Sequence, residues 1–268
     1  KKFPDQFKLI TGDIRNPEHL QGVFKKNRID LIIHLAARAG VRPSIAQPLL
    51  YQDVNIRGTI VLLEVCKEYG IKDFIFASSS SVYGESQRVP FSEEDLNLQP
   101  ISPYGVTKRA GELLCYSYHH LHGMNIACLR IFTAYGPRQR PEMAIHKFTR
   151  LVDQGEKIPM YGDGSSQRDY TYIDDLIEGI QAVIQRHRGF EIYNLGESQT
   201  TSLKELIGLI EEALGKKAKV ELLEPQPGDV SITYADITKA KRMLGYQPQV
   251  NMKEGIKRFV EWYKKENK

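Results

Sequence analysis

Residues 74–81 read Phe-Ile-Phe-Ala-Ser-Ser-Ser-Ser, so a short apolar run ends directly in a row of hydroxyl side chains. An apolar run of this length, bounded by small polar residues, predicts a strand that is buried on both faces. Polar groups at the carboxyl end of such a strand lie where open parallel sheets bind their ligands. The stretch therefore predicts a parallel sheet and also the edge of that sheet where a site is built.

The same rhythm continues on both sides of this stretch. Apolar runs predict further strands at residues 7–10, 31–35, 126–131 and 191–194. Helical periodicity predicts helices between them at residues 17–26, 50–69, 103–121 and 174–185. Because strands that alternate with helices form right-handed crossovers, we expect an α/β fold with a Rossmann-type doubly wound parallel sheet.

The pattern changes after Gly136, where prolines and a turn at residues 162–165 interrupt the alternation. Ser202 and Glu205 have the spacing of a helix N-cap with its capping box, and helices are expected at residues 236–244 and 252–266. We expect a smaller C-terminal lobe of mixed α/β character. The predicted division places residues 1–133 and 173–198 in the sheet domain and residues 134–172 and 199–268 in the lobe.

Composition excludes several classes of protein. The chain has 268 residues, of which 41% are hydrophobic and 26% charged, as in ordinary globular proteins. A net charge of +4 without charge runs argues against nucleic acid, and no stretch approaches the roughly 18 apolar residues of a membrane span. Cys66, Cys115 and Cys128 lie in apolar segments, which favours reduced core thiols, a cytoplasmic protein and no metal site.

Tyr104 and Lys108 form a Tyr-x-x-x-Lys pair that shares one face of a predicted helix. A nearby ammonium favours the phenolate, so this tyrosine could act as a base near neutral pH. Taken alone, the pair is better explained as an amphipathic surface pair, and the upstream serines are explained by a loop cap. The two features together raise the weight of the catalytic interpretation.

Together these motifs resemble the extended short-chain dehydrogenase/reductase superfamily, and within it the NAD-dependent nucleotide-sugar epimerases and dehydratases. Each short string is modestly specific, but their order and spacing along nearly the whole chain are very specific. The segments that carry the resemblance are residues 12–15, 34–37, 55–59, 78–84, 104–108, 129–137, 168–175 and 227–230.

The resemblance implies a set of site residues. The catalytic residues would be Tyr104, Lys108 and Ser79. The cofactor NAD would be bound by Asp13, Ile14, Leu35, Ala36, Ala37, Asn55, Ser78, Tyr104, Lys108 and Phe132. The nucleotide sugar would be bound by Arg42, Ser80, Ser81, Thr133, Arg140, Arg168 and Asp229. For Arg42 and Arg140, surface ion pairing is an equal alternative, whereas the fork of Arg168 suits a diphosphate.

The resemblance also implies a homodimer, in which two helices of each subunit pair into a four-helix bundle. Those helices would be residues 50–69 and 103–121. Their outer faces are expected to present Leu62, Val65, Cys115, Tyr116 and Tyr118.

The chain departs from the family at its beginning. Members start with a strand, a glycine-rich turn and a helix, whose backbone approaches the cofactor pyrophosphate. This GxxGxxG βαβ segment is absent here, and residue 1 stands near what resembles the third strand. Because the downstream motifs are intact, we expect the segment to precede residue 1 in the complete protein. The alternative is a true deletion, which would leave a catalytically inactive binding protein.

The residues beside Ser79 bear on the reaction that the resemblance implies. The family oxidises C4 of the sugar, with a tyrosinate accepting the hydroxyl proton while hydride moves to NAD+. Dehydratases follow the Ser79 position with Asp-Glu, and UDP-glucuronate decarboxylases have Glu where this chain has Ser81. Since Ser80 and Ser81 provide neither carboxylate, the acid/base pair for elimination is missing. What remains is 4-epimerisation through a 4-keto sugar.

The sugar itself is suggested by residues 36–44 and 136–144, which resemble UDP-glucuronate 4-epimerases. In those enzymes, hydroxyls equivalent to Ser80, Ser81 and Thr133 hold the sugar carboxylate. UDP-glucose epimerases place Asn at the position of Thr133, so the expected substrate is UDP-glucuronate. A UDP-glucose or UDP-N-acetylhexosamine 4-epimerase is the alternative.

Overall fold

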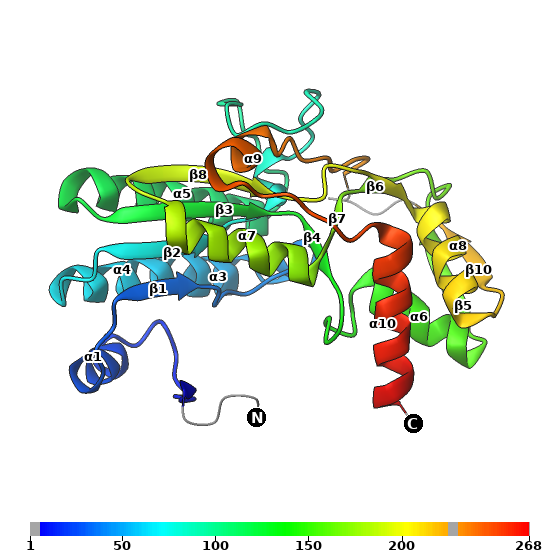
Figure 1. The fold of residues 1–268 in the computed structure, drawn as a ribbon, viewed down its shortest axis with the longest axis horizontal. Coiled ribbons are helices and arrows are strands. Elements are labelled where there is room, and N and C mark those ends of the chain that lie inside the picture. The colour runs from blue at the N-terminus through cyan, green and yellow to red at the C-terminus, as the bar shows by residue number, and fades with distance from the viewer. Residues whose placement is uncertain (1–5, 225–229, 268) are drawn as a thin grey trace.

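A four-stranded parallel sheet forms the centre of the larger part of the molecule (Figure 1). The computed structural model describes residues 6–224 and 230–267. The strands, in spatial order, are β1 (Leu31–His34), β2 (Asp73–Ala77), β3 (Asn125–Ile131) and β8 (Phe190–Leu195). Every neighbouring pair is parallel, so all four carboxyl ends meet at one edge.

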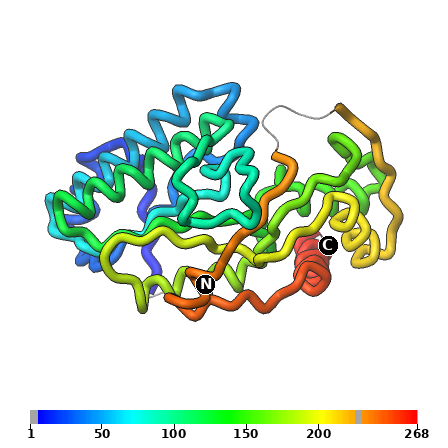
Figure 2. Tube along the Cα trace, turned by 90° about the horizontal axis from the view of Figure 1, so that it is seen from above, coloured from blue at the N-terminus to red at the C-terminus, as the bar shows by residue number. Residues whose placement is uncertain are grey.

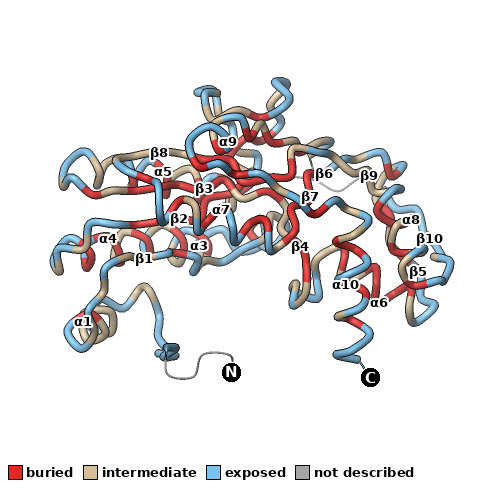
Figure 3. The backbone as a smooth tube through the Cα atoms, viewed as in Figure 1, coloured by how far each residue is buried: buried red, intermediate tan, exposed pale blue. Residues whose placement is uncertain are grey.

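Helices cover both faces of the sheet, as the sequence predicted. Along β2, Phe74 and Phe76 point to one face and Ile75 to the other, because successive strand side chains alternate. The first face packs on α1 (Pro17–Lys26), α4 (Gly58–Glu68) and α5 (Pro103–His122). The second packs on α7 (Ile173–Arg186) and α9 (Thr238–Leu244). In Figure 3 the buried stretches follow β2 and β3 between these two layers.

A second core lies beyond the carboxyl edge of the sheet. It is built from α6 (Ala144–Gln154), α8 (Leu203–Leu214), α10 (Met252–Glu266) and β5 (Lys157–Tyr161). Strand β10 (Lys219–Leu223) pairs with β5 in parallel, and its residues are exposed. Helix α8 begins with the predicted capping box of Ser202 and Glu205. Seen from above, this lobe stands apart from the sheet and its helices (Figure 2).

Short elements join the two cores. They are the parallel pair β4 (Thr133–Tyr135) and β7 (Tyr170–Tyr172) and the antiparallel pair β6 (Gln167–Arg168) and β9 (Thr201–Ser202). The helices α2 (Val41–Ala46) and α3 (Pro48–Tyr51) and a 3-10 turn, Ser80–Tyr83, pack against α5 on the sheet side.

The chain passes between the two cores repeatedly. Tyr135 packs in the lobe core, Leu176 in the sheet core, Leu206 in the lobe, Ile237 in the sheet core and Ile256 in the lobe again. We propose the same division into a sheet domain and a lobe, with one amendment. Helix α9 was assigned to the lobe, but its apolar face packs against α7 and β8 under the sheet.

One expectation about local structure is wrong, and another needs refinement. Residues 7–10 form no strand, since a strand needs a hydrogen-bonding neighbour and no strand in the described part of the chain runs beside them. The helix predicted at residues 50–69 is split by a π-helical segment, Gln52–Arg57. Helix α4 then begins at Gly58, where a Cβ would lie 2.6 Å from Cδ1 of Ile14.

The expected outer faces of α4 and α5 also need correction. Leu62, Val65 and Cys115 are buried against the sheet rather than exposed, because they lie on the apolar side that covers Phe74 and Phe76. Tyr116 does face outward, and its side chain is 53% exposed. The cysteines 66, 115 and 128 are all free and buried. Across residues 6–224 and 230–267, no helix is long and apolar enough to cross a membrane.

Candidate active site

A cavity of about 660 Å³ opens at the carboxyl edge of the sheet, between the strands and the lobe. Leu35, Ala77 and Ile131 line it where β1, β2 and β3 end, and Arg168 and Val230 line it from the lobe side. The cavity therefore lies where the sequence placed the site. A second cavity of about 760 Å³ shares Arg168 and Val230 with the first and continues into the lobe.

Helix α5 brings Tyr104 and Lys108 to this cavity. The helix begins at Pro103, and the side chain of Ser102 caps it by accepting a hydrogen bond from the Gly105 amide at 3.1 Å. Gly105 lets the first turn approach the serine segment closely, because a Cβ there would lie 2.6 Å from the Ser81 carbonyl oxygen. The glycine of the Tyr-Gly-x-x-Lys motif thus has a steric reason.

Lys108 is buried, with 5% of its surface exposed. Its Nζ donates a hydrogen bond to the Ala77 carbonyl at 2.5 Å and lies 5.9 Å from the centroid of the Tyr104 ring. Burial lowers the pKa of Lys108 to about 8 because the charged form loses solvation. The side chain is therefore close to titrating in the physiological range.

The pKa of Tyr104 is raised above its ordinary value, which is opposite to the expectation from the sequence. Burial raises it by disfavouring the phenolate, and this effect exceeds the lowering by a hydrogen bond with Ser79 and by the charge of Arg140. The expectation considered only the ammonium of Lys108, which in the structure is directed at a backbone carbonyl.

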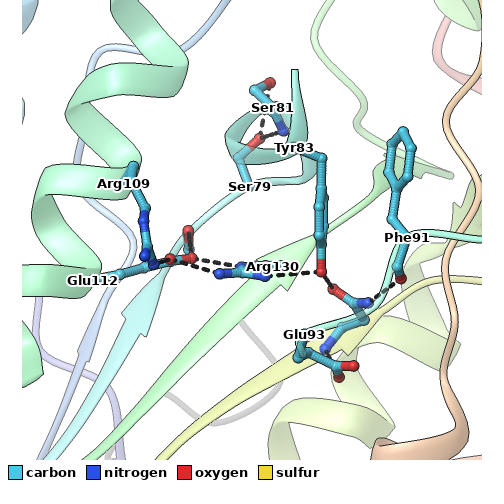
Figure 4. A network of polar contacts seen from close by, with 10 residues as sticks. Ser79, Ser81, Tyr83, Phe91, Glu93, Arg109, Glu112 and Arg130 are labelled. Atoms are coloured by element: carbon cyan, nitrogen blue, oxygen red, sulfur yellow. Dashed lines mark hydrogen bonds and ion pairs between the residues drawn. The ribbon is translucent and has the colours of Figure 1, made fainter. Parts of the chain in front are cut away.

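Ser79 and Ser81 are held side by side by the 3-10 turn that follows β2 (Figure 4). The Ser79 Oγ accepts a hydrogen bond from the Ser81 amide and donates one to the Ser81 Oγ, both at 3.1 Å. Ser80 lines the same wall of the cavity. Tyr104 lines the same cavity, and Ser79 is the hydroxyl that lowers the pKa of this tyrosine.

Phe132, Thr133 and Arg140 also line the cavity. Arg140 also forms an ion pair with Glu142 at 3.0 Å, as the alternative interpretation expected, and its role toward the substrate stays a prediction. Arg42 lies outside this cavity and lines the second one, with its guanidinium 4.8 Å from the centroid of the Tyr161 ring. The predicted substrate residue Asp229 lies outside the described residues.

The charge of the first cavity has one sign. Lys108, Arg138, Arg140 and Arg168 line it, and no Asp or Glu is among the described residues that do. Such a cavity favours an anionic ligand and offers no carboxylate for acid/base chemistry.

Comparison with known proteins follows from this geometry. The family model described as GDP-mannose 4,6 dehydratase matches residues 1–259. The chain belongs to this family of extended short-chain dehydrogenases/reductases. A protein of Thermodesulfobacterium geofontis named UDP-glucuronate 4-epimerase is 44% identical over 265 residues, which span 98% of this chain and 81% of the relative.

Two solved members of the family are similar throughout the fold. A UDP-glucuronic acid 4-epimerase variant from Bacillus cereus, solved with UDP-4-deoxy-4-fluoro-glucuronic acid and NAD, is 38% identical with a TM-score of 0.91, covering 98% of this chain and 83% of that one. A UDP-glucose 4-epimerase from Thermotoga maritima, solved with UDP-glucose, is 34% identical with a TM-score of 0.92, covering 96% and 84%.

The residues expected to bind the family cofactor fall into two groups. Leu35, Ala37, Ser78 and Phe132, with Tyr104 and Lys108, line the first cavity, where apolar walls and a buried lysine fit a nicotinamide and its ribose. Asp13, Ile14, Ala36 and Asn55 do not line it.

Two of the residues outside the cavity have other partners. The Asp13 carboxylate pairs with Arg15 at 2.6 Å, and its pKa is lowered to about 2 by the hydrogen bonds from Arg15. The buried side chain of Asn55 bonds both the amide and the carbonyl of Arg38 and the hydroxyl of Thr107. Asn55 therefore connects the loop after β1 to α5 in this structure.

A buried ionic network beneath the serines was not predicted (Figure 4). Glu112 of α5 and Arg130 of β3 each have side chains 1% exposed and form two hydrogen bonds of 2.9 Å with each other. Arg109 and Ser78 also donate to Glu112, and Arg130 donates to the Tyr83 hydroxyl. A sequence signal did exist: Arg130 is the one cation in an apolar strand, and Glu112 follows Tyr104 and Lys108 at helical spacing.

Proposed function

We propose that this protein is an NAD-dependent 4-epimerase that interconverts UDP-glucuronate and UDP-galacturonate. The observation that carries the proposal is the cavity itself. It joins Tyr104, Lys108 and Ser79 to a wall of hydroxyl groups, and the described residues that line it include cations but no carboxylate. An anionic sugar suits this charge, and the reaction needs only proton and hydride transfer at one carbon.

NAD, when bound, would supply the acceptor and the donor for the hydride of C4. Tyr104 accepts the proton of the C4 hydroxyl, and Ser79 orients both hydroxyls by hydrogen bonding. Lys108, with its Nζ 5.9 Å from the tyrosine ring, would favour the phenolate by Coulomb attraction when charged, and this attraction opposes the burial that raises the pKa of Tyr104.

The hydroxyls of Ser80, Ser81 and Thr133 would hold the sugar carboxylate through neutral hydrogen bonds of about 1 kcal/mol or somewhat more each. Such bonds would allow the 4-keto sugar to rotate in the cavity between the two hydride transfers. The diphosphate would lie against Arg168, and the nucleoside in the second cavity beside Arg42 and Tyr161.

The direct test is to incubate the full-length protein with UDP-glucuronate, UDP-glucose and UDP-N-acetylglucosamine separately and to resolve the products by NMR. We expect UDP-galacturonate from the first and little conversion of the others. Tyr104→Phe should bind the substrate but lose at least about 10²-fold in turnover. Conversion of only a neutral sugar would overturn the acid-sugar assignment, and retained turnover in Tyr104→Phe would overturn the mechanism.

The place of the sugar carboxylate has its own test. Ser81→Glu puts a second negative charge beside it, and the repulsion favours loss of CO₂ from the β-keto acid. We expect less epimer and a new UDP-pentose product, detected by mass spectrometry. Clean epimerisation at the parent rate would show that Ser81 does not contact the carboxylate.

We also propose a homodimer. Leu113, Tyr116 and Leu121 on α5 are 55%, 53% and 67% exposed, which is more apolar surface than a free outer helix needs. Light scattering at micromolar concentration should give twice the monomer mass. A monomer at this concentration would refute the proposal.

A further inference from the structure

Helix α5 is fastened to the carboxyl end of β2 at two points, one helical turn apart. The Lys108 Nζ donates to the Ala77 carbonyl at 2.5 Å, and the hydroxyl of the next residue, Ser78, donates to the Glu112 Oε1 at 2.6 Å. Tyr104, Lys108 and Glu112 are spaced four residues apart and so share one face of α5. Both fastenings therefore lie on the helix face that presents the tyrosine.

The hydrogen bond between Ser78 and Glu112 is held in place by the groups around Glu112. Glu112 accepts two hydrogen bonds of 2.9 Å from Arg130 and one of 2.8 Å from Arg109, so its carboxylate has no freedom to move. The Ser78 side chain is buried, with 4% exposure of the residue, and its hydroxyl proton is committed to Glu112. This hydroxyl is therefore not a free donor for a ligand.

Ser78 is joined directly to Ser79, which lines the cavity together with Tyr104 and lowers the pKa of that tyrosine. We propose that Ser78 is a positioning residue: its hydrogen bond to Glu112 fixes the end of β2 against α5 and so keeps Ser79 beside Tyr104. The proposal rests on the proposed epimerase function for its kinetic readout, but its geometric content does not depend on the identity of the sugar.

The consequence is measurable because few groups act on Tyr104. Arg140 from the loop after β4, Tyr51 from α3 and Lys108 from α5 face it, together with Ser79. Ser79 follows the end of β2 directly, and Lys108 is bonded to that end through the Ala77 carbonyl, whereas Arg140 and Tyr51 lie on other elements. If Ser79 moves away from Tyr104, the pKa of Tyr104 rises further, since the hydrogen bond with Ser79 lowers it.

The experiment compares Ser78→Ala, Ser78→Thr and Ser78→Cys in the full-length protein. For Ser78→Ala we expect kcat to fall about tenfold near pH 7, while KM for UDP-glucuronate stays within about threefold. The rise of kcat with pH should also move to higher pH. Ser78→Thr keeps the hydroxyl and should restore rate and profile. Ser78→Cys, a weaker donor of similar size, should be intermediate and serves if the alanine variant does not fold.

The matched control is Thr149→Val, which removes another fully buried hydroxyl bond, from Thr149 to the Ile145 carbonyl in α6. It should lower the melting temperature without moving the pH profile. An unshifted profile in Ser78→Ala, or the same shift in Ser78→Thr, would overturn the positioning role.

A second readout separates this proposal from the proposed function. The phenolate absorbance is measured as a function of pH for each variant and for the same variant that also carries Tyr104→Phe. The difference between the two curves is the titration of Tyr104. We expect a higher midpoint in Ser78→Ala than in the parent. If the parent epimerises no sugar, the proposed function fails while this titration still decides the positioning role, and an unchanged midpoint refutes it.

Discussion

Glu112 and Glu197 are both buried carboxylates, yet their surroundings drive their pKa values in opposite directions. Burial raises the pKa of Glu112, but the hydrogen bonds and charge of Arg130, with Ser78 and Arg109, outweigh burial and leave the pKa below its usual value. Glu112 lies under the serine wall, in the network of Figure 4.

Glu197 lies just beyond β8, where the sheet meets the lobe, and is 8% exposed. Its Oε2 has no hydrogen-bond partner among the described residues. Burial, followed by the charges of Asp175 and Asp169, raises its pKa to about 7. Asp169 accepts backbone hydrogen bonds from Glu197, Ser198 and Ala235, yet burial still raises its pKa to about 6.

The difference teaches that burial alone does not decide the state of an acid in this fold. Beneath the serines, the Glu112 carboxylate is paired with guanidinium groups and stays charged, so it can hold the neighbouring elements in a fixed position. At the junction of the two cores, Glu197 and Asp169 have raised pKa values and so hold their protons to higher pH than exposed acids do. The first arrangement should be sensitive to mutation and the second to pH.

The largest effect is expected from Glu112→Gln. The substitution leaves Arg130 buried without its counter-charge, which should lower the free energy of unfolding by about 3–5 kcal/mol. Urea denaturation measures this loss. The double variant Glu112→Gln with Arg130→Met removes both charges and should recover much of it, whereas a single variant within about 1 kcal/mol of the parent would contradict the anchoring role.

The next effect concerns Glu197→Gln. Because the pKa of Glu197 is higher in the folded chain than its ordinary 4.5, ionisation costs stability as pH rises from about 4.5 to 7, and the full cost is present above 7. The variant should be about 2 kcal/mol more stable than the parent at pH 8 and equal to it near pH 4. Exposed Glu261→Gln is the control, and an equal gain at both pH values would refute the explanation.

A smaller effect of opposite sign is expected from His34. Burial, with the charge of Lys108, lowers its pKa to about 4, so the unfolded chain binds a proton more readily as pH falls from 6.5. His34 should therefore cost about 1–2 kcal/mol of stability between pH 6.5 and 5. Melting curves of His34→Gln should be flatter across this range than those of the parent, and an equally steep loss would argue against a neutral, buried imidazole.

The smallest effect is expected for an ion pair on the solvent-exposed surface. Arg28 and Asp30 form an ion pair at 3.1 Å with side chains 90% and 74% exposed. Asp30→Asn should change the free energy of unfolding by less than about 0.5 kcal/mol, because water screens such pairs. A loss near that of Glu112→Gln would mean that burial is not what separates these pairs.

The fold and the centre of the site could be predicted from the sequence because their signals are local. Apolar runs mark the strands, and the family motifs carry Tyr104, Lys108 and Ser79 into one cavity. The strand at residues 7–10 could not be judged in this way, since a strand exists only through a neighbour. The direction of the Tyr104 pKa was also missed, because it depends on burial and on the partner that Lys108 selects.

The partners of Glu112 and Glu197 could not be predicted from the sequence either, because they depend on how distant segments pack together. Each pairing joins segments far apart in the chain, such as Glu112 with Arg130 and Glu197 with Asp169. The sequence shows that a cation in an apolar strand needs a counter-charge, but not which acid supplies it.

The repeated passage of the chain between the two cores has a consequence for how such a protein can change over generations. No single contiguous segment contains the lobe, since Leu176 and Ile237 return to the sheet core between lobe segments. Recombination at one or two breakpoints would therefore split both cores instead of transplanting one. New sugar preferences in this architecture should arise by point substitution along the cavity wall, with the lobe and the sheet inherited as one unit.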